Sequence, residues 1–124
     1  MDLNIQGQSV TRVCFDAALT ILTSEDCELR VESEATLGMR DGALIPFAPE
    51  SPGTAAADLV ELRSDVIVSA EVGSAGELAV TFESGRKLVV SSHGEYEAWG
   101  FVGCRGRRVT CMPGGELAVW GEGD

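Results

Sequence analysis

The stretch that closes the chain, from Tyr96 to Trp120, reads YEAWGFVGCRGRRVTCMPGGELAVW. It contains both tryptophans and the single tyrosine, so it supplies large side chains to a core otherwise built from Val, Leu, Ala and Ile. Gly and Pro divide it into short apolar segments, which predicts closing strands within residues 96–120 and a turn at Pro113-Gly114-Gly115. We expect Trp99 and Trp120 in the core and Tyr96 at the surface.

Two similar three-stranded meanders precede this stretch, in residues 9–32 and 65–91. Apolar residues alternate with period two at Leu19, Ile21, Leu29 and Val31 and, 59 residues later in each case, at Leu78, Val80, Leu88 and Val90. The spacing predicts that Ile21 lies opposite Leu29, with Asp26 in the left-handed turn position that Gly85 takes in the second copy. We interpret the two meanders as an internal duplication.

A linker and a helix separate the two meanders, in residues 45–63. Three prolines between residues 45 and 53 exclude a central strand, because each removes a backbone donor, so we predict a loop there. Residues 54–63 predict the single short helix, capped by Ser51 or Thr54. Its buried face consists of Ala55, Leu59 and Leu62.

These segments add up to about nine strands and one short helix in a single domain of residues 1–124. We predict a mainly β fold, an antiparallel sandwich or a partly open barrel. It is built from two repeated meanders plus a C-terminal meander. A chain of this length can bury a core without disulfide or metal cross-links.

The chain is strongly acidic, with 20 Asp and Glu against 9 Lys and Arg and a net charge of −11. This balance disfavours nucleic acid as a partner, since DNA affinity depends on cationic side chains, and favours a basic protein. The sequence has neither a membrane-spanning apolar run nor a basic and apolar signal segment at its start. We therefore expect a cytoplasmic protein with no membrane partner, and leave a homodimer open.

The four cysteines are expected to be reduced thiols. The strand pattern directs Cys27 into the core opposite Thr23 and Cys14 to the other face, and it separates Cys104 and Cys111 onto opposite faces of a hairpin. No pair of cysteines has the close spacing of a zinc site. We assign no metal and no disulfide.

No set of residues forms a recognisable reaction centre, so we assign no catalytic residue and no cofactor and favour a non-enzymatic role. His93, the single histidine, follows a strand directly beside Ser91 and Ser92. Neighbours in sequence do not reproduce the geometry of a histidine base and a serine nucleophile, which joins distant segments. We interpret His93 as an exposed loop residue.

Arg105, Arg107 and Arg108 project from a predicted hairpin tip in an otherwise acidic chain. We favour pairing with carboxylates of the same molecule or of a twin subunit. The alternative is that the arginines hold a phosphate or carboxylate ligand. Together with His93 and Tyr96 they make the binding surface that we predict.

The chain resembles a family of small, mostly actinobacterial proteins classed as a domain of unknown function. The resemblance rests chiefly on two tryptophan-containing boxes, Tyr96-Glu97-Ala98-Trp99 and the stretch from Pro113 to Trp120. Weaker matches lie at Gly7, in residues 10–13 and 16–20, and around Leu78, Phe82 and Gly85. The resemblance implies the same duplicated β architecture and brings no reaction with it.

Three functions remain open at this point. The preferred hypothesis is a non-enzymatic protein-binding module, of which an inhibitor or immunity-type protein is one form. The second is a small-ligand binder or enzyme with a pocket near Tyr96, His93 and residues 105–108. The third is a structural module that associates with itself through an uncovered sheet edge.

Overall fold

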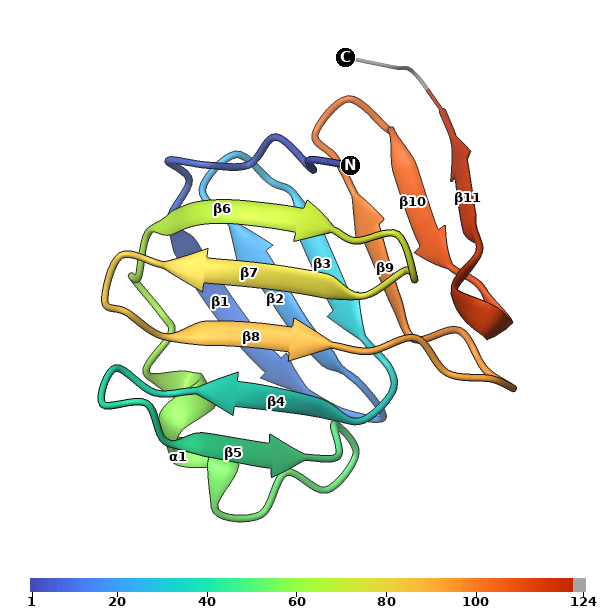
Figure 1. Ribbon diagram of the computed structural model, residues 1–124. Helices are drawn as coiled ribbons and strands as arrows, with labels where there is room; N and C mark the ends of the chain where they lie inside the picture. Colours follow the sequence, from blue (N-terminus) through green and yellow to red (C-terminus); the bar gives the residue numbers. More distant parts are fainter. Residues whose placement is uncertain (122–124) are drawn as a thin grey trace.

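Two antiparallel sheets pack face to face in the computed structural model, which describes residues 1–121 (Figure 1). One sheet has the strand order β1-β2-β3-β9-β10-β11 and the other β5-β4-β8-β7-β6. The sandwich alternative is therefore correct, and residues 122–124 of the predicted domain lie outside the described part. The elements are β1 (Val10–Phe15), β2 (Leu19–Thr23), β3 (Glu28–Val31), β4 (Ala35–Gly38), β5 (Leu44–Phe47), α1 (Ala55–Val60), β6 (Ile67–Val72), β7 (Leu78–Phe82), β8 (Lys87–Val90), β9 (Trp99–Val102), β10 (Arg108–Cys111), η1 (Pro113–Gly115) and β11 (Leu117–Trp120).

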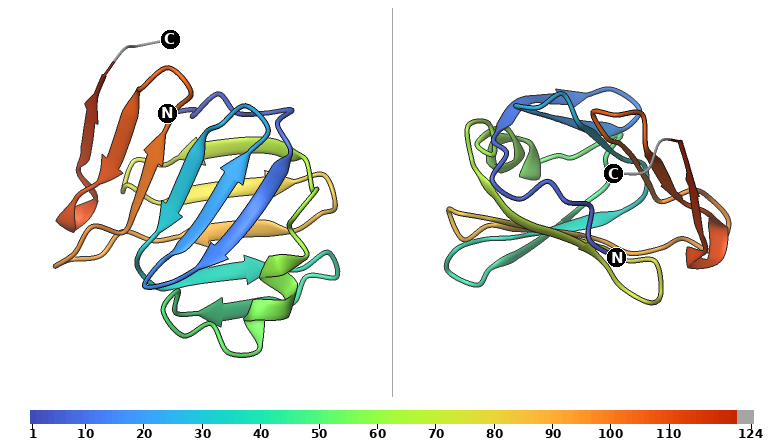
Figure 2. Two further views of the ribbon diagram at one scale, coloured as in Figure 1. Left: turned by 180° about the vertical axis from the view of Figure 1, so that it is seen from behind. Right: turned by 90° about the horizontal axis from the view of Figure 1, so that it is seen from above.

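The strands of the two sheets cross at a steep angle, the arrangement of an orthogonal sandwich (Figure 1). Seen from above, the sheets form two layers, with α1 at one end and the β9–β11 meander at the other (Figure 2). The core between the layers contains the largest buried side chains, including Trp99, Phe82, Leu19 and Leu88. Within the described residues, no helix combines the length and apolarity needed to cross a membrane.

The registers of both predicted meanders are confirmed. Ile21 pairs with Leu29 and Leu19 with Val31, as Val80 pairs with Leu88 and Leu78 with Val90. The turn residues Asp26 (φ 64°) and Gly85 (φ 97°) both have the left-handed backbone that the three-residue loop requires. The first meander lies in the six-stranded sheet and the second in the five-stranded sheet, so they face each other across the core.

The two meanders meet through their first strands in an arrangement with approximate two-fold symmetry. The Val10 amide donates to the Asp65 carbonyl and the Ile67 amide to the Gln8 carbonyl, each at 2.8 Å. Residues 8 and 10 of the first half correspond to residues 65 and 67 of the second, each 57 positions later. The two bonds are therefore the same bond made once from each half. The same shift relates a second pair of 2.7 Å bonds, from Gly7 to Ile67 and from Ser64 to Val10.

The structural similarity of the two halves extends beyond the two meanders. β4 follows the first meander but pairs with β8 of the second, and β9 follows the second meander but pairs with β3 of the first. The turns after β4 and β9 have the same hydrogen bond: the Gly42 amide donates to the Met39 carbonyl, and the Gly106 amide donates to the Gly103 carbonyl. Corresponding residues of the two turns are 64 positions apart in the chain. Each half of the chain therefore supplies three strands to one sheet and two to the other, and β11 is an eleventh strand without a counterpart in the first half.

Two predictions for the middle of the chain need correction. Residues 45–47 of the predicted loop belong to the edge strand β5, which tolerates Pro46 because an edge strand has one side without ladder bonds. α1 is shorter than the predicted helix, and its N-cap residue Thr54 makes no side-chain capping bond. The predicted apolar face is confirmed, because Ala55, Leu59 and Leu62 are all buried.

Candidate functional site

His93 and Tyr96 lie together in the connection between β8 and β9. Their ring centroids are 4.9 Å apart, and His93 Nδ1 accepts a hydrogen bond from the Glu95 amide at 3.0 Å. Tyr96 is 66% exposed, which confirms its predicted surface position. Both rings line a depression of about 350 Å³ beside Glu32, Glu34 and Glu50, so their surroundings are acidic.

The hydrolytic alternative for His93 receives no support from this geometry. Ser91 and Ser92 line a second depression with His93, but no serine hydroxyl in residues 1–121 is hydrogen-bonded to the imidazole. His93 Nδ1 is already used by the backbone of its own loop. A nucleophile and its base would need a direct hydrogen bond or a single bridging water.

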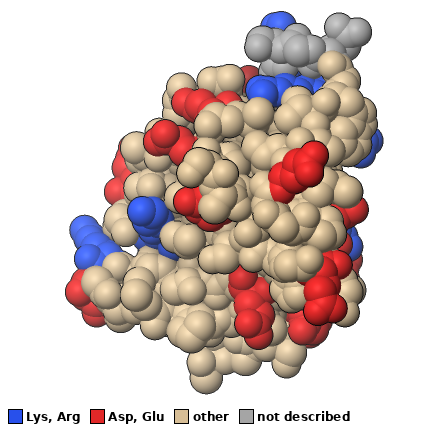
Figure 3. Space-filling model, turned by 45° about the vertical axis from the view of Figure 1, so that its right-hand side comes forward, with Lys and Arg blue, Asp and Glu red and all other residues tan. Residues whose placement is uncertain are grey.

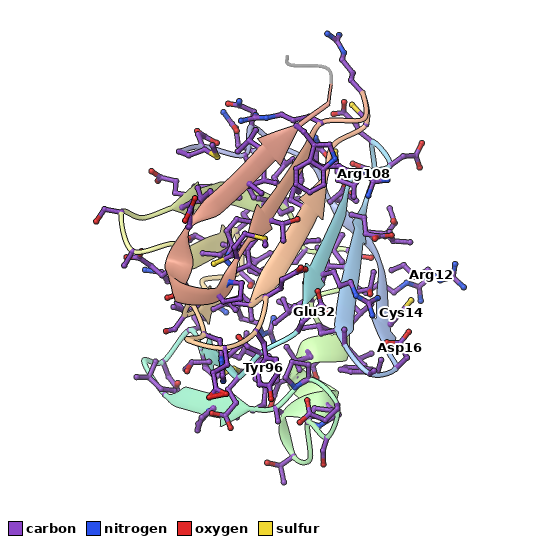
Figure 4. All side chains as sticks on the ribbon, turned by 90° about the vertical axis from the view of Figure 1, so that its right-hand side faces the viewer. Arg12, Cys14, Asp16, Glu32, Tyr96 and Arg108 are labelled. Carbon is purple, nitrogen blue, oxygen red and sulfur yellow. The ribbon has the colours of Figure 1, made fainter. Side chains whose placement is uncertain are left out.

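The three arginines lie at the other end of β9. Arg105 and Arg107 belong to the β9–β10 turn, which the Gly103 amide closes by donating to the Arg107 carbonyl at 2.7 Å. Figure 4 shows Arg108 and Tyr96 at opposite ends of the same sheet face. The structure therefore splits the predicted binding surface into two parts, and no described depression contains both Tyr96 and an arginine.

The predicted pairing of these arginines with carboxylates of the same molecule is not found within residues 1–121. The ion pairs there join Arg30 to Glu32 and Arg86 to Glu61. Arg108 instead points outward from the six-stranded sheet, next to Trp120 on β11. Arg105 and Arg108 are exposed, whereas Arg107 is half-buried.

A charged groove crosses the outer face of the six-stranded sheet. The registers align Glu28, Val102, Arg108 and Trp120 in one row across β3, β9, β10 and β11, and Arg30, Gly100, Thr110 and Ala118 in the next. Gly100 has no side chain, which leaves a hollow of about 170 Å³ lined by Glu28, Arg30, Glu32 and Arg108. Charges of both signs meet there, so the groove suits charged side chains of a partner better than an apolar ligand.

β11 forms the outermost edge of this sheet, and here the sequence prediction for Trp120 was wrong. Trp120 is 50% exposed and Val119 47% exposed, on opposite faces of the strand. The cause is the position of β11, which lies beyond the end of the five-stranded sheet (Figures 1 and 2). The inward residues of β10, Val109 and Cys111, are still fully buried, as is Trp99 on β9.

The predicted positions of Cys14 and Cys27 are confirmed, whereas Cys104 lies within the β9–β10 turn and not on a strand that flanks it. Cys27 is buried, and its backbone amide donates a hydrogen bond of 3.1 Å to Thr23 Oγ1. Cys14 lies on the outer face of β1 and is half-buried, while Cys104 is exposed and Cys111 buried. In residues 1–121, no three His, Cys, Asp or Glu side chains are grouped so that they could hold a metal ion.

The protein surface is strongly acidic, in keeping with the net charge of −11. In Figure 3, carboxylate side chains are spread over the visible face, while basic side chains form small groups near its margins. A surface of this kind accelerates encounters with a cationic partner and makes the association sensitive to salt.

A family model matches residues 1–121, and its description is a family of unknown function, DUF6188. The chain belongs to DUF6188. The resemblance to an uncharacterised family is thereby confirmed, while the specific sequence boxes and the bacterial group stay predictions. Comparison with curated proteins found no match, and comparison with solved structures found none. Because the DUF6188 description names no activity, the function must be argued from the geometry.

Proposed function

We propose that this DUF6188 protein is a protein-binding module whose main contact is the open edge of β11. The observation that carries the proposal is the half-exposure of Val119 and Trp120 on opposite faces of an unpaired edge strand. Edge strands of soluble proteins are usually short, charged or covered, because they invite pairing with another chain. β11 is short but bears no charged residue between Leu117 and Trp120.

The backbone of β11 supports strand addition. The Met112 amide donates to the Glu116 carbonyl at 2.7 Å, which sets the alternation of the β10–β11 ladder. By this alternation Ala118 and Trp120 bond to β10, whereas Leu117 and Val119 direct their N–H and C=O groups to the open edge. An extended segment of a partner would bond to these groups as a further strand.

The side chains around the edge define the chemistry of the partner. Val119 offers an apolar contact on the inner face, and Trp120 on the outer face lies beside Arg108 and next to the charged groove. Tryptophan and arginine are frequent in the centres of protein interfaces. The acidic surface favours a partner segment with alternating apolar residues on a basic protein. Within this proposal, the negative net charge of the protein favours a cytoplasmic inhibitor or immunity-type protein that binds a basic partner.

The proposal is tested by capturing partners from lysate of the source organism at low and high salt, and by reconstituting the complex from purified components. We expect a stoichiometric complex that salt weakens. Hydrogen exchange of the reconstituted complex should show slowed exchange of the Leu117 and Val119 amides. Val119→Pro removes one of these donors and should abolish binding, while the matched variant Val68→Pro, at another exposed strand valine, serves as the control. A complex with unchanged exchange at β11 would refute the site.

Self-association is a second candidate, favoured by the same open edge. Two copies of β11 would pair antiparallel about a two-fold axis, so that the contact closes after two subunits. Light scattering of the purified protein at high concentration distinguishes this candidate from the first. A dimer that Val119→Pro dissociates would support self-association, and a monomer would remove it.

A further inference from the structure

Cys27 and Cys104 lie next to each other although 77 positions (104 minus 27) separate them in the chain. Cys27 ends the β2–β3 turn, and Cys104 begins the β9–β10 turn. The pairing of β3 with β9, with Glu28 opposite Val102, brings these two turns to the same end of the sheet. By the same register, Cys27 lies opposite Gly103, and Cys104 follows Gly103 in the chain.

The two thiols are near enough for Cys27 to contribute, after desolvation, to raising the pKa of the Cys104 thiol. Both line one depression of about 310 Å³, which also contains Ile5, Gln8 and Arg105. Cys27 is 2% exposed, whereas Cys104 is exposed on the turn. A reagent from solvent thus reaches Cys104, and the only other cysteine lining that depression is the buried Cys27.

The internal repeat does not impose this cysteine pair. In the other half of the chain, Arg86 corresponds to Cys27, 59 positions later. Arg40 corresponds to Cys104, 64 positions earlier. The turns are neighbours there too, since a Cβ on Gly85 would lie 3.2 Å from the Arg40 side chain. One end of the sandwich therefore bears two arginines, and the other end, by the same backbone geometry, bears two thiols.

We propose that Cys27 and Cys104 form an oxidisable dithiol that a hydroperoxide converts reversibly to a disulfide. The Cys104 thiolate attacks the hydroperoxide, the O–O bond breaks, and Cys104 becomes a sulfenic acid as water or an alcohol leaves. The Cys27 sulfur then displaces the hydroxyl group of Cys104 as a second water, and the S–S bond forms. The two thiols together lose two electrons and two protons, and the hydroperoxide gains them.

The surroundings of Cys104 make this reaction dependent on pH. Desolvation is the largest cause that raises the pKa of the Cys104 thiol. The neighbouring Cys27 thiol and, less strongly, the Glu25 carboxylate raise it further, against a lowering by Arg105. The thiolate is the reactive form. Oxidation is therefore slow at neutral pH and faster in alkaline solution, which suits a site that responds to sustained oxidant.

The test treats the reduced, purified chain with hydrogen peroxide alone and blocks the remaining thiols with an alkylating reagent. Cleavage after Lys, Arg and Glu separates all four cysteines, into peptides 13–25, 26–28, 98–105 and 109–116. We expect the peptides 26–28 and 98–105 to appear as one disulfide-linked species that dithiothreitol separates again.

Two variants and one further measurement complete the test. Cys104→Ser should lose the linked species, while the control Cys14→Ser, on the outer face of β1, should retain it. Thermal melts of both variants verify that each is folded. In the wild-type chain, oxidation should raise the melting temperature, because the disulfide ties two turns that are distant in sequence. Two results would overturn the proposal: oxidation of Cys104 to sulfinic acid, or a Cys104 disulfide between two chains. In either case Cys27 would still react with the alkylating reagent after the chain is unfolded.

Discussion

The indole Nε1 of Trp99 donates a hydrogen bond of 2.9 Å to the carbonyl oxygen of Gly76. Trp99 belongs to the six-stranded sheet, and Gly76 lies in the β6–β7 loop of the other sheet. This loop has two more residues than its counterpart between β1 and β2, and the additional length carries Gly76 to the C-terminal meander. Gly76 also accepts a bond from Cys111 Sγ at 3.4 Å. A departure from the internal symmetry therefore fixes β9 and β10 to the rest of the fold.

Trp99→Phe should lower the free energy of unfolding by about 1–3 kcal/mol, because the buried Gly76 carbonyl loses its stronger donor. The vacated volume adds to this loss. Denaturant unfolding followed by circular dichroism measures the change. Trp120→Phe, at the half-exposed tryptophan, is the matched control and should be close to neutral. Equal losses for the two variants would contradict the assigned role of Trp99.

Gly76→Ala should destabilise the protein more than Gly114→Ala. Both glycines have left-handed backbones, with φ of 85° and 87°, so alanine costs about 1–2 kcal/mol at either position. A methyl group on Gly76 would also collide with the backbone of Gly115, whereas one on Gly114 meets nothing within 4 Å. We expect a further loss of about 1–3 kcal/mol for Gly76→Ala. Equal melting temperatures for the two variants would show that the loop and the turn do not touch.

Proline substitutions in β11 test which backbone groups face the open edge. Ala118→Pro removes a donor to β10 and should cost about 1–3 kcal/mol. Val119→Pro removes a donor that faces solvent and should leave the stability within about 1 kcal/mol of the wild type. Thermal and denaturant unfolding give both values. If Val119→Pro is the more damaging change, the alternation of the ladder is the reverse of the one described.

The alkylation rate of Cys104 should rise with pH to a midpoint above that of an ordinary cysteine, because the pKa of this thiol is raised. Cys27→Ala removes a neighbour that raises the pKa, so the midpoint should move to lower pH while desolvation keeps part of the shift. Iodoacetamide labelling followed by mass spectrometry of peptide 98–105 measures the rate. Cys111→Ala should leave the Cys104 profile unchanged, and an upward shift in Cys27→Ala would contradict the effect of Cys27 on the pKa of Cys104.

Much of the local structure could be predicted from sequence because it depends on neighbours in the chain. Period-two alternation and turn chemistry are sufficient to assign the pairing of Ile21 with Leu29, the left-handed Asp26 and the outward Tyr96. The apolar face of α1 was predicted for the same reason. β5 was missed because Pro46 excludes a central strand but not an edge strand, and sequence alone does not say which strand lies at an edge.

Only the tertiary structure decided which distant segments meet. The exchange of β4 and β9 between the halves depends on packing across the core, and it places Cys104 beside Cys27. Trp99 and Trp120 are alike in sequence, yet one is buried and the other half-exposed because β11 extends beyond the opposing sheet. The chain by itself determined its strands, turns and charge. Packing between segments that are distant in sequence brings the two thiols together. The same packing leaves the edge of β11 uncovered.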